Sequence, residues 1–258
     1  CLVLVADLFV KEKSRVITLL LSLLALVVSA VLTLQSFDLE QKTLVFSGTF
    51  VRDPMGDVLK LFIYVVVFMV FVYSQKYLKD RNLFKGEYYI LGLFGTLGMM
   101  IMVSAHNLLT VYLGLELLSL SMYAMVAMHR DSLKASEAGM KYFLLGAMAS
   151  GMLLYGMSLI YGLTGSLDLT EIHTRIFDNQ DTLVQIFALS FIIVGIAFKL
   201  GAVPFHMWVP DVYHGAPTAM TMYIGSAPKI AAFAMLMRLL VDGLQGLHGS
   251  WQDMLAVL

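Results

Sequence analysis

The feature that most constrains this chain is a repeated pattern of apolar stretches, each about 20 residues long, separated by polar connectors. A helix of that length crosses ~30 Å of hydrocarbon at about 1.5 Å per residue. Apolar residues make up 59% of the chain and charged residues only 14%, whereas about a quarter of a soluble domain is charged. We therefore expect an all-α polytopic membrane protein and exclude a soluble enzyme.

About eight to nine transmembrane helices are predicted, some of them incomplete. The chain begins without methionine and ends inside an apolar run, so we interpret it as a fragment that lacks residues at both ends. No basic region precedes the first apolar segment, so a cleavable signal peptide is not predicted. The complete spans are 16–34, 58–77, 88–105, 107–128, 138–162, 182–203 and 217–240, and partial helices occupy 1–10 and 250–258.

Basic residues are distributed unevenly between the two sides of this topology. Nine lysines and arginines fall in loops on one side and three on the other, where the connectors 35–57 and 166–181 are acidic. By the positive-inside rule, we expect the basic side to face the cytoplasm, or the matrix or stroma. The nine are Lys11, Lys13, Arg15, Lys76, Lys79, Arg81, Lys85, Arg130 and Lys134, and the three are Lys42, Arg52 and Arg175.

The cysteine content limits the metal and redox chemistry of the chain. Cys1 is the single cysteine. Disulfides, zinc–thiolate sites and iron–sulfur clusters held within this chain are therefore excluded. We expect no cofactor and no metal on this chain.

Two lysines within apolar spans indicate where the chemistry takes place. Lys199 precedes Pro204, and Lys229 follows Pro228. A lysine at bilayer depth costs roughly 2.5–3.5 kcal/mol on insertion scales, and a proline inside a helix frees a carbonyl that needs another partner. We expect Pro204 to end its half-helix at Leu200, where the helix dipole favours a protonated Lys199. The two lysine–proline pairs predict a polar path through the membrane. The alternative for Lys199 is that its side chain snorkels to the cytoplasmic interface.

Glu116 is the one carboxylate placed deep within a predicted span. An acid at that depth is by default a residue of an ion pathway, and the alternative is a protonated glutamic acid that holds a neighbouring helix. Counted from the outer ends of their spans, Lys199 and Glu116 differ in depth by about 10 Å. Direct pairing of the two side chains would then require helix tilt, shifted span boundaries or a bridging water.

Three further polar residues have less specific signals. Lys141 lies near the cytoplasmic end of its span, where proton transfer and a structural role are equally compatible with the sequence. His206 and His214 flank the break at Pro204, but their spacing matches no recognised metal site. We interpret these histidines as part of a polar connection to the cytoplasm.

Four segments around these residues resemble one known family. From about residue 85 to residue 238, the chain is similar to the antiporter-like membrane subunits of respiratory complex I. The most specific segment is VPFHxWxPDVYxGAP, and the motifs around Glu116 and Lys229 are also specific. The four segments are LGLELLSL, EAGMKYFLLGAMASGMLLYG, FKLGAVPFHMWVPDVYHGAPTAMT and SAPKIAAF.

The resemblance implies a fold of about fourteen transmembrane helices in two inverted five-helix repeats, with broken helices at the midplane. Residues 1–258 then form a single transmembrane domain, in which 1–84 are N-terminal helices, 85–240 are the first repeat and 241–258 start the following helix. The second repeat, and the lysine of the family's broken twelfth helix, have no counterpart here. The outer half of a proton path is therefore undefined in this chain.

The resemblance also assigns positions to the charged residues. Glu116 corresponds to the glutamate of the family's fifth helix, and Lys141 to a lysine of the sixth. Lys199 corresponds to the lysine of the broken seventh helix, and Lys229 to that of the eighth. In the implied mechanism, Glu116 pairs with Lys199. A signal that weakens this pair lets Lys199 lose its proton towards Lys229 through water.

The implied function is proton translocation as a membrane subunit of NADH:quinone oxidoreductase, a translocase. The proton relay would consist of Glu116, Lys199, Lys229 and Lys141, with Pro204, His206 and Pro228 marking the helix breaks and the polar path. NADH, FMN, iron–sulfur clusters and quinone are expected on partner subunits. The expected partners are the other antiporter-like and small membrane subunits and the lipid bilayer, with no nucleic acid. We expect the bacterial inner membrane rather than an organellar one.

Other functions share these sequence features. A subunit of a multi-subunit sodium/proton antiporter, or of a membrane-bound hydrogenase, has the same ancestral motifs. A structural membrane subunit would use its buried charges only to hold helices together. A quinone-binding subunit is disfavoured, because no polar pocket motif is evident beyond His206.

Overall fold

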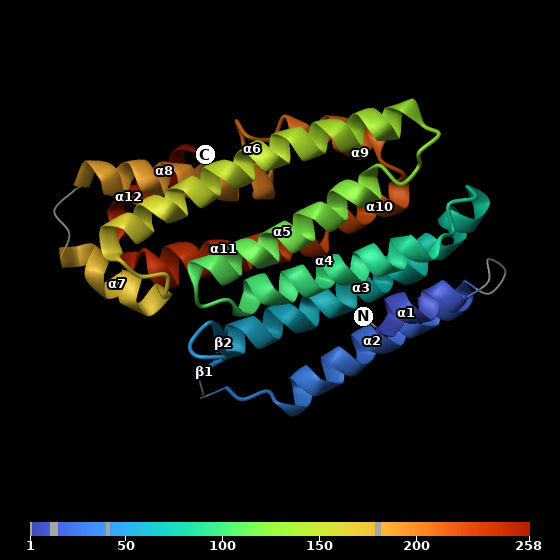
Figure 1. Ribbon diagram of the computed structural model, residues 1–258, viewed down its shortest axis with the longest axis horizontal. Helices are drawn as coiled ribbons and strands as arrows, with labels where there is room; N and C mark the ends of the chain where they lie inside the picture. The colour runs from blue at the N-terminus through green and yellow to red at the C-terminus, as the bar shows by residue number, and fades with distance from the viewer. Residues whose placement is uncertain (1, 11–14, 40–41, 179–181) are drawn as a thin grey trace.

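The computed structural model describes residues 2–10, 15–39, 42–178 and 182–258. Within these residues, seven spans are long and apolar enough to cross a membrane. They form a bundle of roughly antiparallel helices (Figure 1). Six are single helices, and the last combines α10, α11 and a π-helical segment, η2. The spans are α2 (Val16–Gln35), α3 (Pro54–Asp80), α4 (Gly86–Ser104), α5 (Leu108–Val126), α6 (Leu133–Thr164), α8 (Thr182–Leu200) and Thr218–Gly243.

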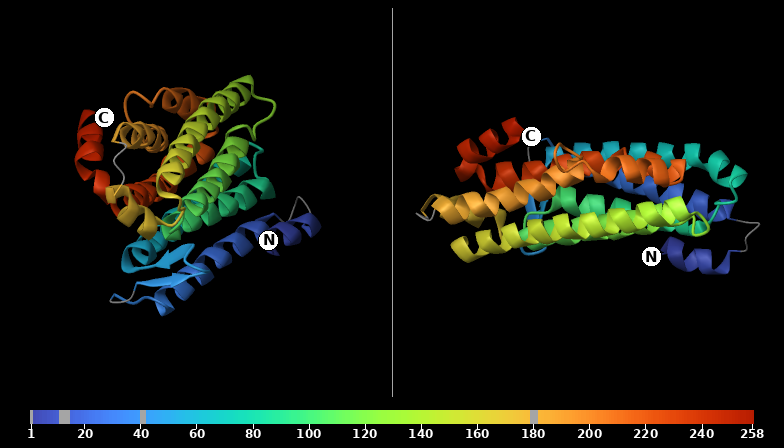
Figure 2. Two further views of the ribbon diagram at one scale, coloured as in Figure 1. Left: turned by 60° about the vertical axis from the view of Figure 1, so that its left-hand side comes forward. Right: turned by 90° about the horizontal axis from the view of Figure 1, so that it is seen from above.

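The two terminal segments that were expected to be partial spans are short helices. α1 (Leu2–Phe9) has 8 residues and α12 (His248–Val257) has 10. At about 1.5 Å per residue they extend only ~12–15 Å. Within the described residues, these two terminal helices are therefore too short to cross the membrane. The two lie far from each other in the bundle, α1 beside α2 and α12 beside α8 (Figure 2).

Shorter elements join the spans. The connector 35–57, expected to be polar, contains a hairpin of β1 (Thr43–Val45) and β2 (Phe50–Arg52). The two strands pair antiparallel, with Thr43 opposite Arg52. The remaining elements are α7 (Leu169–Asp178), α9 (Trp208–Gly215), α10 (Thr218–Ile224), α11 (Ala227–Leu236), η2 (Met237–Gly243) and the 3₁₀ turn η3 (Gln245–Leu247).

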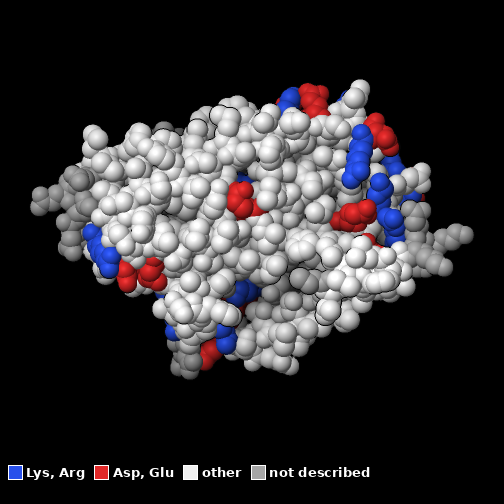
Figure 3. Space-filling model, viewed as in Figure 1, with Lys and Arg blue, Asp and Glu red and all other residues white. Residues whose placement is uncertain are grey.

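The connectors gather at two opposite ends of the bundle, as expected from the charge pattern. At one end Arg15 forms an ion pair with Glu87, and the Thr218 amide donates to the Tyr77 hydroxyl. At the other end the hairpin and the connectors after α4 and α6 meet through short β-bridges. Charged side chains are concentrated near these ends, and the surface between them is mostly uncharged (Figure 3). Most of the basic loop 11–15, together with Glu40 and Asp181 of the acidic connectors, lies outside the described residues.

Helices α4 and α5 approach each other unusually closely because both carry glycine at their crossing. A Cβ built on Gly98 would lie 2.6 Å from the Leu118 amide nitrogen and 2.7 Å from the Gly114 carbonyl oxygen. Small residues permit this backbone contact between helices in a membrane, where packing rather than the hydrophobic effect drives association. The contact holds α5, which carries Glu116, tightly against its neighbour.

Helix α8 ends at Leu200, as Pro204 led us to expect, but a glycine supplies the turn. Gly201 adopts a left-handed conformation with φ of +73°. Its amide donates to the Phe198 carbonyl at 3.1 Å, and the Ala202 amide donates to the Ala197 carbonyl at 2.9 Å. These two bonds are the Schellman pattern of helix termination. Residues 201–203, expected to belong to the span, lie outside the helix.

The last span, expected over 217–240 with Pro228 marking a helix break, is interrupted just before that proline. α10 ends at Ile224 and α11 begins at Ala227, with Ser226 in a non-helical conformation between them. Pro228 falls in the first turn of α11, where its missing N–H has no intrahelical partner to lose. Pro228 therefore opens a half-helix instead of distorting a continuous one.

Candidate functional site

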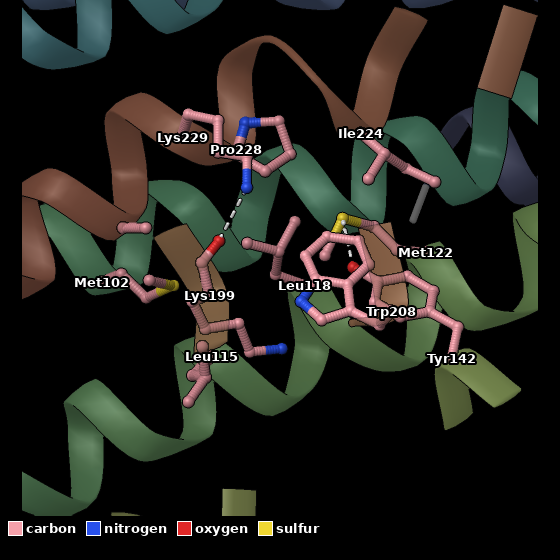
Figure 4. Close-up of a pocket in the computed structure, with 11 residues that line it drawn as sticks. Met102, Leu115, Leu118, Met122, Tyr142, Lys199, Trp208, Ile224, Pro228 and Lys229 are labelled. Atoms are coloured by element: carbon pink, nitrogen blue, oxygen red, sulfur yellow. Dashed lines mark hydrogen bonds between the residues drawn. The ribbon is translucent and has the colours of Figure 1, made fainter. Parts of the chain in front are cut away.

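The two helix breaks meet at Lys229. Its ammonium Nζ donates to the main-chain carbonyl of Lys199 at 3.0 Å (Figure 4) and to that of Leu200 at 2.9 Å. These carbonyls belong to the last turn of α8, where a helix leaves its acceptors without partners and carries partial negative charge. Lys229 thus provides, from another helix, the cap that the end of α8 requires.

Lys199 points its own ammonium towards α5. Its side chain is buried, with 8% exposure, and its Nζ donates to Ser119 Oγ at 2.6 Å. The Ser119 hydroxyl in turn donates to the Leu115 carbonyl at 2.5 Å. The ring of Tyr123 lies 5.8 Å from Lys199 Nζ, close enough for a cation–π contact. Lys199 therefore does not snorkel to an interface in this structure.

Aromatic rings cover the two lysines from the side of α9. Trp208 begins this short helix and stacks on Tyr142, with ring centroids 4.7 Å apart. Its indole Nε1 donates to the Phe198 carbonyl at 3.0 Å, and Lys229 Nζ lies 5.1 Å from its ring centroid. Trp208 therefore contacts both the end of α8 and the ammonium that caps it.

A small cavity lies between the two lysines. Its volume is about 10 Å³, which is on the scale of one water molecule. Apart from Lys199 and Lys229, its walls are mostly apolar and aromatic (Figure 4). A proton that passes between the two ammonium groups would need a water there or a movement of the side chains. The lining residues include Met102, Leu115, Leu118, Met122 and Tyr142.

Glu116 lies near Lys199 but is hydrogen-bonded elsewhere. Its carboxylate accepts a short hydrogen bond from the Ser150 hydroxyl of α6, and Ser150 Oγ also lies 3.3 Å from the Tyr112 hydroxyl. Glu116 and Lys199 interact electrostatically, although these two described residues form no direct salt bridge. Because Ser119 follows Glu116 by three residues, about 4.5 Å along the helix axis, the depth mismatch is smaller than the sequence suggested. The direct pair expected from the resemblance is absent, since each charge has a serine as its partner.

Lys141 is outside this buried group. Its side chain is 43% exposed, and its Nζ lies 2.9 Å from both Glu137 Oε1 and Asp211 Oδ2. With His214, these residues line a surface hollow of about 230 Å³ between α6 and α9. The structure therefore joins Lys141 to the charged surface rather than to the two buried lysines.

The predicted polar residues of the connector have different surroundings. Pro204 and His206 are exposed in the turn between α8 and α9, whereas Pro228 is buried beside Lys229. No group of three His, Cys, Asp or Glu residues that could hold a metal ion occurs among the described residues.

Sequence reasoning missed the neutral partners of the charges. Ser119 and Ser150 carry no signal by themselves, because serine is common in membrane helices. Trp208 was part of the recognised motif but was not singled out. Only the position of Ser119, one turn after Glu116, could have indicated a polar face on α5.

Comparison with known proteins places this geometry in a family. The family described as NADH:quinone oxidoreductase/Mrp antiporter, transmembrane, matches residues 105–258. NADH-quinone oxidoreductase subunit N of Thioalkalivibrio sulfidiphilus is 59% identical over 260 residues, covering 100% of this chain and 54% of that protein. Its counterpart in Thiobacillus denitrificans is 57% identical and is covered to 53%. The chain thus spans about half the length of the curated relatives it matches.

Two solved structures share the fold. A chain of respiratory complex I from Thermus thermophilus with bound aureothin superposes with a TM-score of 0.76 at 30% identity, covering 92% of this chain and 50% of that one. A chain of an archaeal membrane-bound sulfane sulfur reductase gives a TM-score of 0.74 at 26% identity, covering 90% and 49%. The predicted all-α, multi-pass membrane fold of the antiporter-like type is confirmed. This chain belongs to the NADH:quinone oxidoreductase/Mrp antiporter family of transmembrane proteins.

Proposed function

We propose that this chain is part of subunit N of a bacterial proton-translocating NADH:quinone oxidoreductase, in the inner membrane, and that it carries protons through Glu116, Lys199 and Lys229. The names of its relatives support the assignment. Residues 85–240 would form the first of two antiporter-like repeats. The redox cofactors and quinone would be bound by partner subunits, and quinone reduction there would supply the energy.

The observation that carries the proposal is the pair of bonds from Lys229 Nζ to the last carbonyls of α8. They link the protonation of one lysine to the conformation of the helix that carries the other. A charged Lys229 stabilises the negative end of α8. When Lys229 is neutral that stabilisation weakens, and the end of α8, with Lys199, is freer to move.

The proton transfer follows from this arrangement. With Lys229 neutral, the proton leaves Lys199 Nζ, crosses the cavity through a water molecule and joins Lys229 Nζ. Glu116 opposes the loss, because a nearby negative charge favours the charged lysine. A change at Glu116 therefore releases the proton. Moving one charge against 100 mV costs roughly 2.3 kcal/mol.

The test is Lys229→Ala in an assembled complex in membrane vesicles. We expect fewer protons to be pumped per NADH oxidised, with slower quinone reduction. Lys79→Ala is the control, because Lys79 is an exposed lysine at the basic end of α3. Pumping that is unchanged in Lys229→Ala would remove Lys229 from the path. If charge-removing variants either fail to assemble or pump normally, the chain is a structural subunit.

A second candidate function is supported by the fold match to the sulfane sulfur reductase and by the antiporter members of the family. In that case the same buried residues would serve sodium/proton exchange or another respiratory complex. Lys141 remains a predicted relay residue whose position favours the surface end of such a path. Pumping measured with and without sodium, in vesicles supplied with NADH, separates the two candidates.

A further inference from the structure

A buried arginine lies on the same span as Lys229. Arg238, nine residues further along, has 1% exposure and lies in η2. Its Nη1 and Nη2 each donate to one carboxylate oxygen of Asp53 at 2.7 Å. Its Nη1 also donates to Asp242 at 2.9 Å, and its Nε donates to the Val103 carbonyl at 2.9 Å. Every nitrogen of the guanidinium is therefore engaged.

The partners of Arg238 are the ends of two other spans. Asp53 is the N-cap of α3 and also accepts from the Gly56 amide at 2.9 Å. Val103 is in the last turn of α4. A two-pronged bond to a carboxylate requires the planar guanidinium, which lysine cannot imitate. Arg238 therefore ties the end of the Lys229 span to the beginning of α3 and the end of α4.

The position of α11 along its axis depends on its packing and on the polar contacts at its two ends. Its helix is interrupted before Ala227, so α10 does not hold it in register. It packs against α3, α4 and α8, and its buried residues are mostly small: Ala227, Pro228, Ala231, Ala232, Ala234 and Met235. Small side chains allow close approach of neighbouring helices, and methionine adapts its shape to the space around it. Polar contacts at the two ends of the segment, Lys229 and Arg238, then decide its position.

We propose that Arg238, together with Asp53, is a positioning residue that sets the axial position of α11 and so holds Lys229 Nζ at the carbonyls of Lys199 and Leu200. Arg238 and Lys229 are separated by roughly 13 Å along the helix, so Arg238 acts on Lys229 through the helix and not by contact. The inference rests on the proposed function of Lys229. It assigns a role to a residue outside the proton path.

The test is a double-mutant cycle in the assembled complex. Proton pumping is measured for Arg238→Gln, Lys229→Ala and the double variant, with Arg175→Gln as the matched control. Arg175 is an arginine at the same end of the bundle, but it is 49% exposed, pairs with Glu171 on its own helix and donates to the Thr164 carbonyl at the end of α6. We expect Arg238→Gln to lower pumping several-fold, Arg238→Lys to lower it as well, and Arg175→Gln to leave it unchanged.

The double variant distinguishes positioning from general support of the fold. If Arg238 acts through Lys229, the double variant pumps as Lys229→Ala does, because contributions that share one target are not additive. If the losses of the two single variants multiply in the double variant, the inference is overturned. It is also overturned if Arg238→Gln pumps normally while Lys229→Ala is impaired. This second result leaves the proposed function of Lys229 standing. If Arg238→Gln does not assemble, the cycle is run with Arg238→Lys. Failure of both to assemble also overturns the inference, because Arg238 is then a folding requirement.

Discussion

Replacement of Ser119 by alanine isolates the contact that holds Lys199. The Ser119 hydroxyl accepts from Lys199 Nζ at 2.6 Å, and both side chains are buried. A hydrogen bond to a charged group is worth about 1.5–3 kcal/mol. Loss of the Lys199–Ser119 hydrogen bond lowers the ratio of charged to neutral Lys199 by roughly ten- to a hundredfold, since about 1.4 kcal/mol corresponds to a factor of ten in an equilibrium constant. We expect pumping and quinone reduction to slow by up to that factor, because charged Lys199 is an intermediate of the proposed transfer.

Ser121 provides a matched control on the same helix. Like Ser119 it is buried and donates to the carbonyl four residues earlier, at 2.7 Å. Ser121 differs in having no lysine as a donor to its hydroxyl among the hydrogen bonds of the described residues. Both variants are assayed in vesicles by the initial rate of proton uptake and by NADH:quinone turnover, with assembly checked on native gels. Equal rates for Ser119→Ala and Ser121→Ala would refute the reasoning, because the Lys199 contact would then have no part in turnover.

Two further predictions concern the helix end and the buried arginine. Gly201→Ala should lower the stability of the fold by roughly 1–2 kcal/mol, because residue 201 has a left-handed conformation. The added Cβ would also crowd Lys229, whose Nζ lies 3.3 Å from it. We expect a lower thermal inactivation midpoint together with slower pumping, and wild-type values for both would contradict this prediction. Burial by itself would raise the pKa of Asp53, but the hydrogen bonds and charge of Arg238 and the Gly56 amide lower that pKa below its ordinary value. The stabilisation is therefore complete above the ordinary carboxyl pKa of ~3.9 and is lost as the pH falls through the lower folded-state pKa. Thermal midpoints measured from about pH 2 to pH 6 should decline less steeply in Asp53→Asn, and identical slopes would argue against this account.

The amino-acid sequence by itself determined the spans and the charges within them. Apolar length is a local property, and a helix in lipid must satisfy its backbone internally. The boundaries of the long helices α2, α3, α4, α5, α6 and α8 could therefore be placed to within about five residues, whereas α7 was not predicted. Glu116, Lys199 and Lys229 were identifiable because a charge in an apolar stretch is costly and is retained for a reason. The end of α8 at Leu200 followed from Pro204 and its neighbours.

The tertiary structure alone decided which groups those charges meet. Lys229 contacts the end of α8, 29 and 30 residues earlier in the chain, and Lys199 contacts Ser119, 80 residues away. Arg238 and Asp53 are separated by 185 residues. Such contacts depend on how helices cross and how closely they pack, and no pattern within one helix encodes them. For the same reason the sequence could not show that Lys141 is exposed, or that Glu116 and Lys199 each have a serine as hydrogen-bond partner.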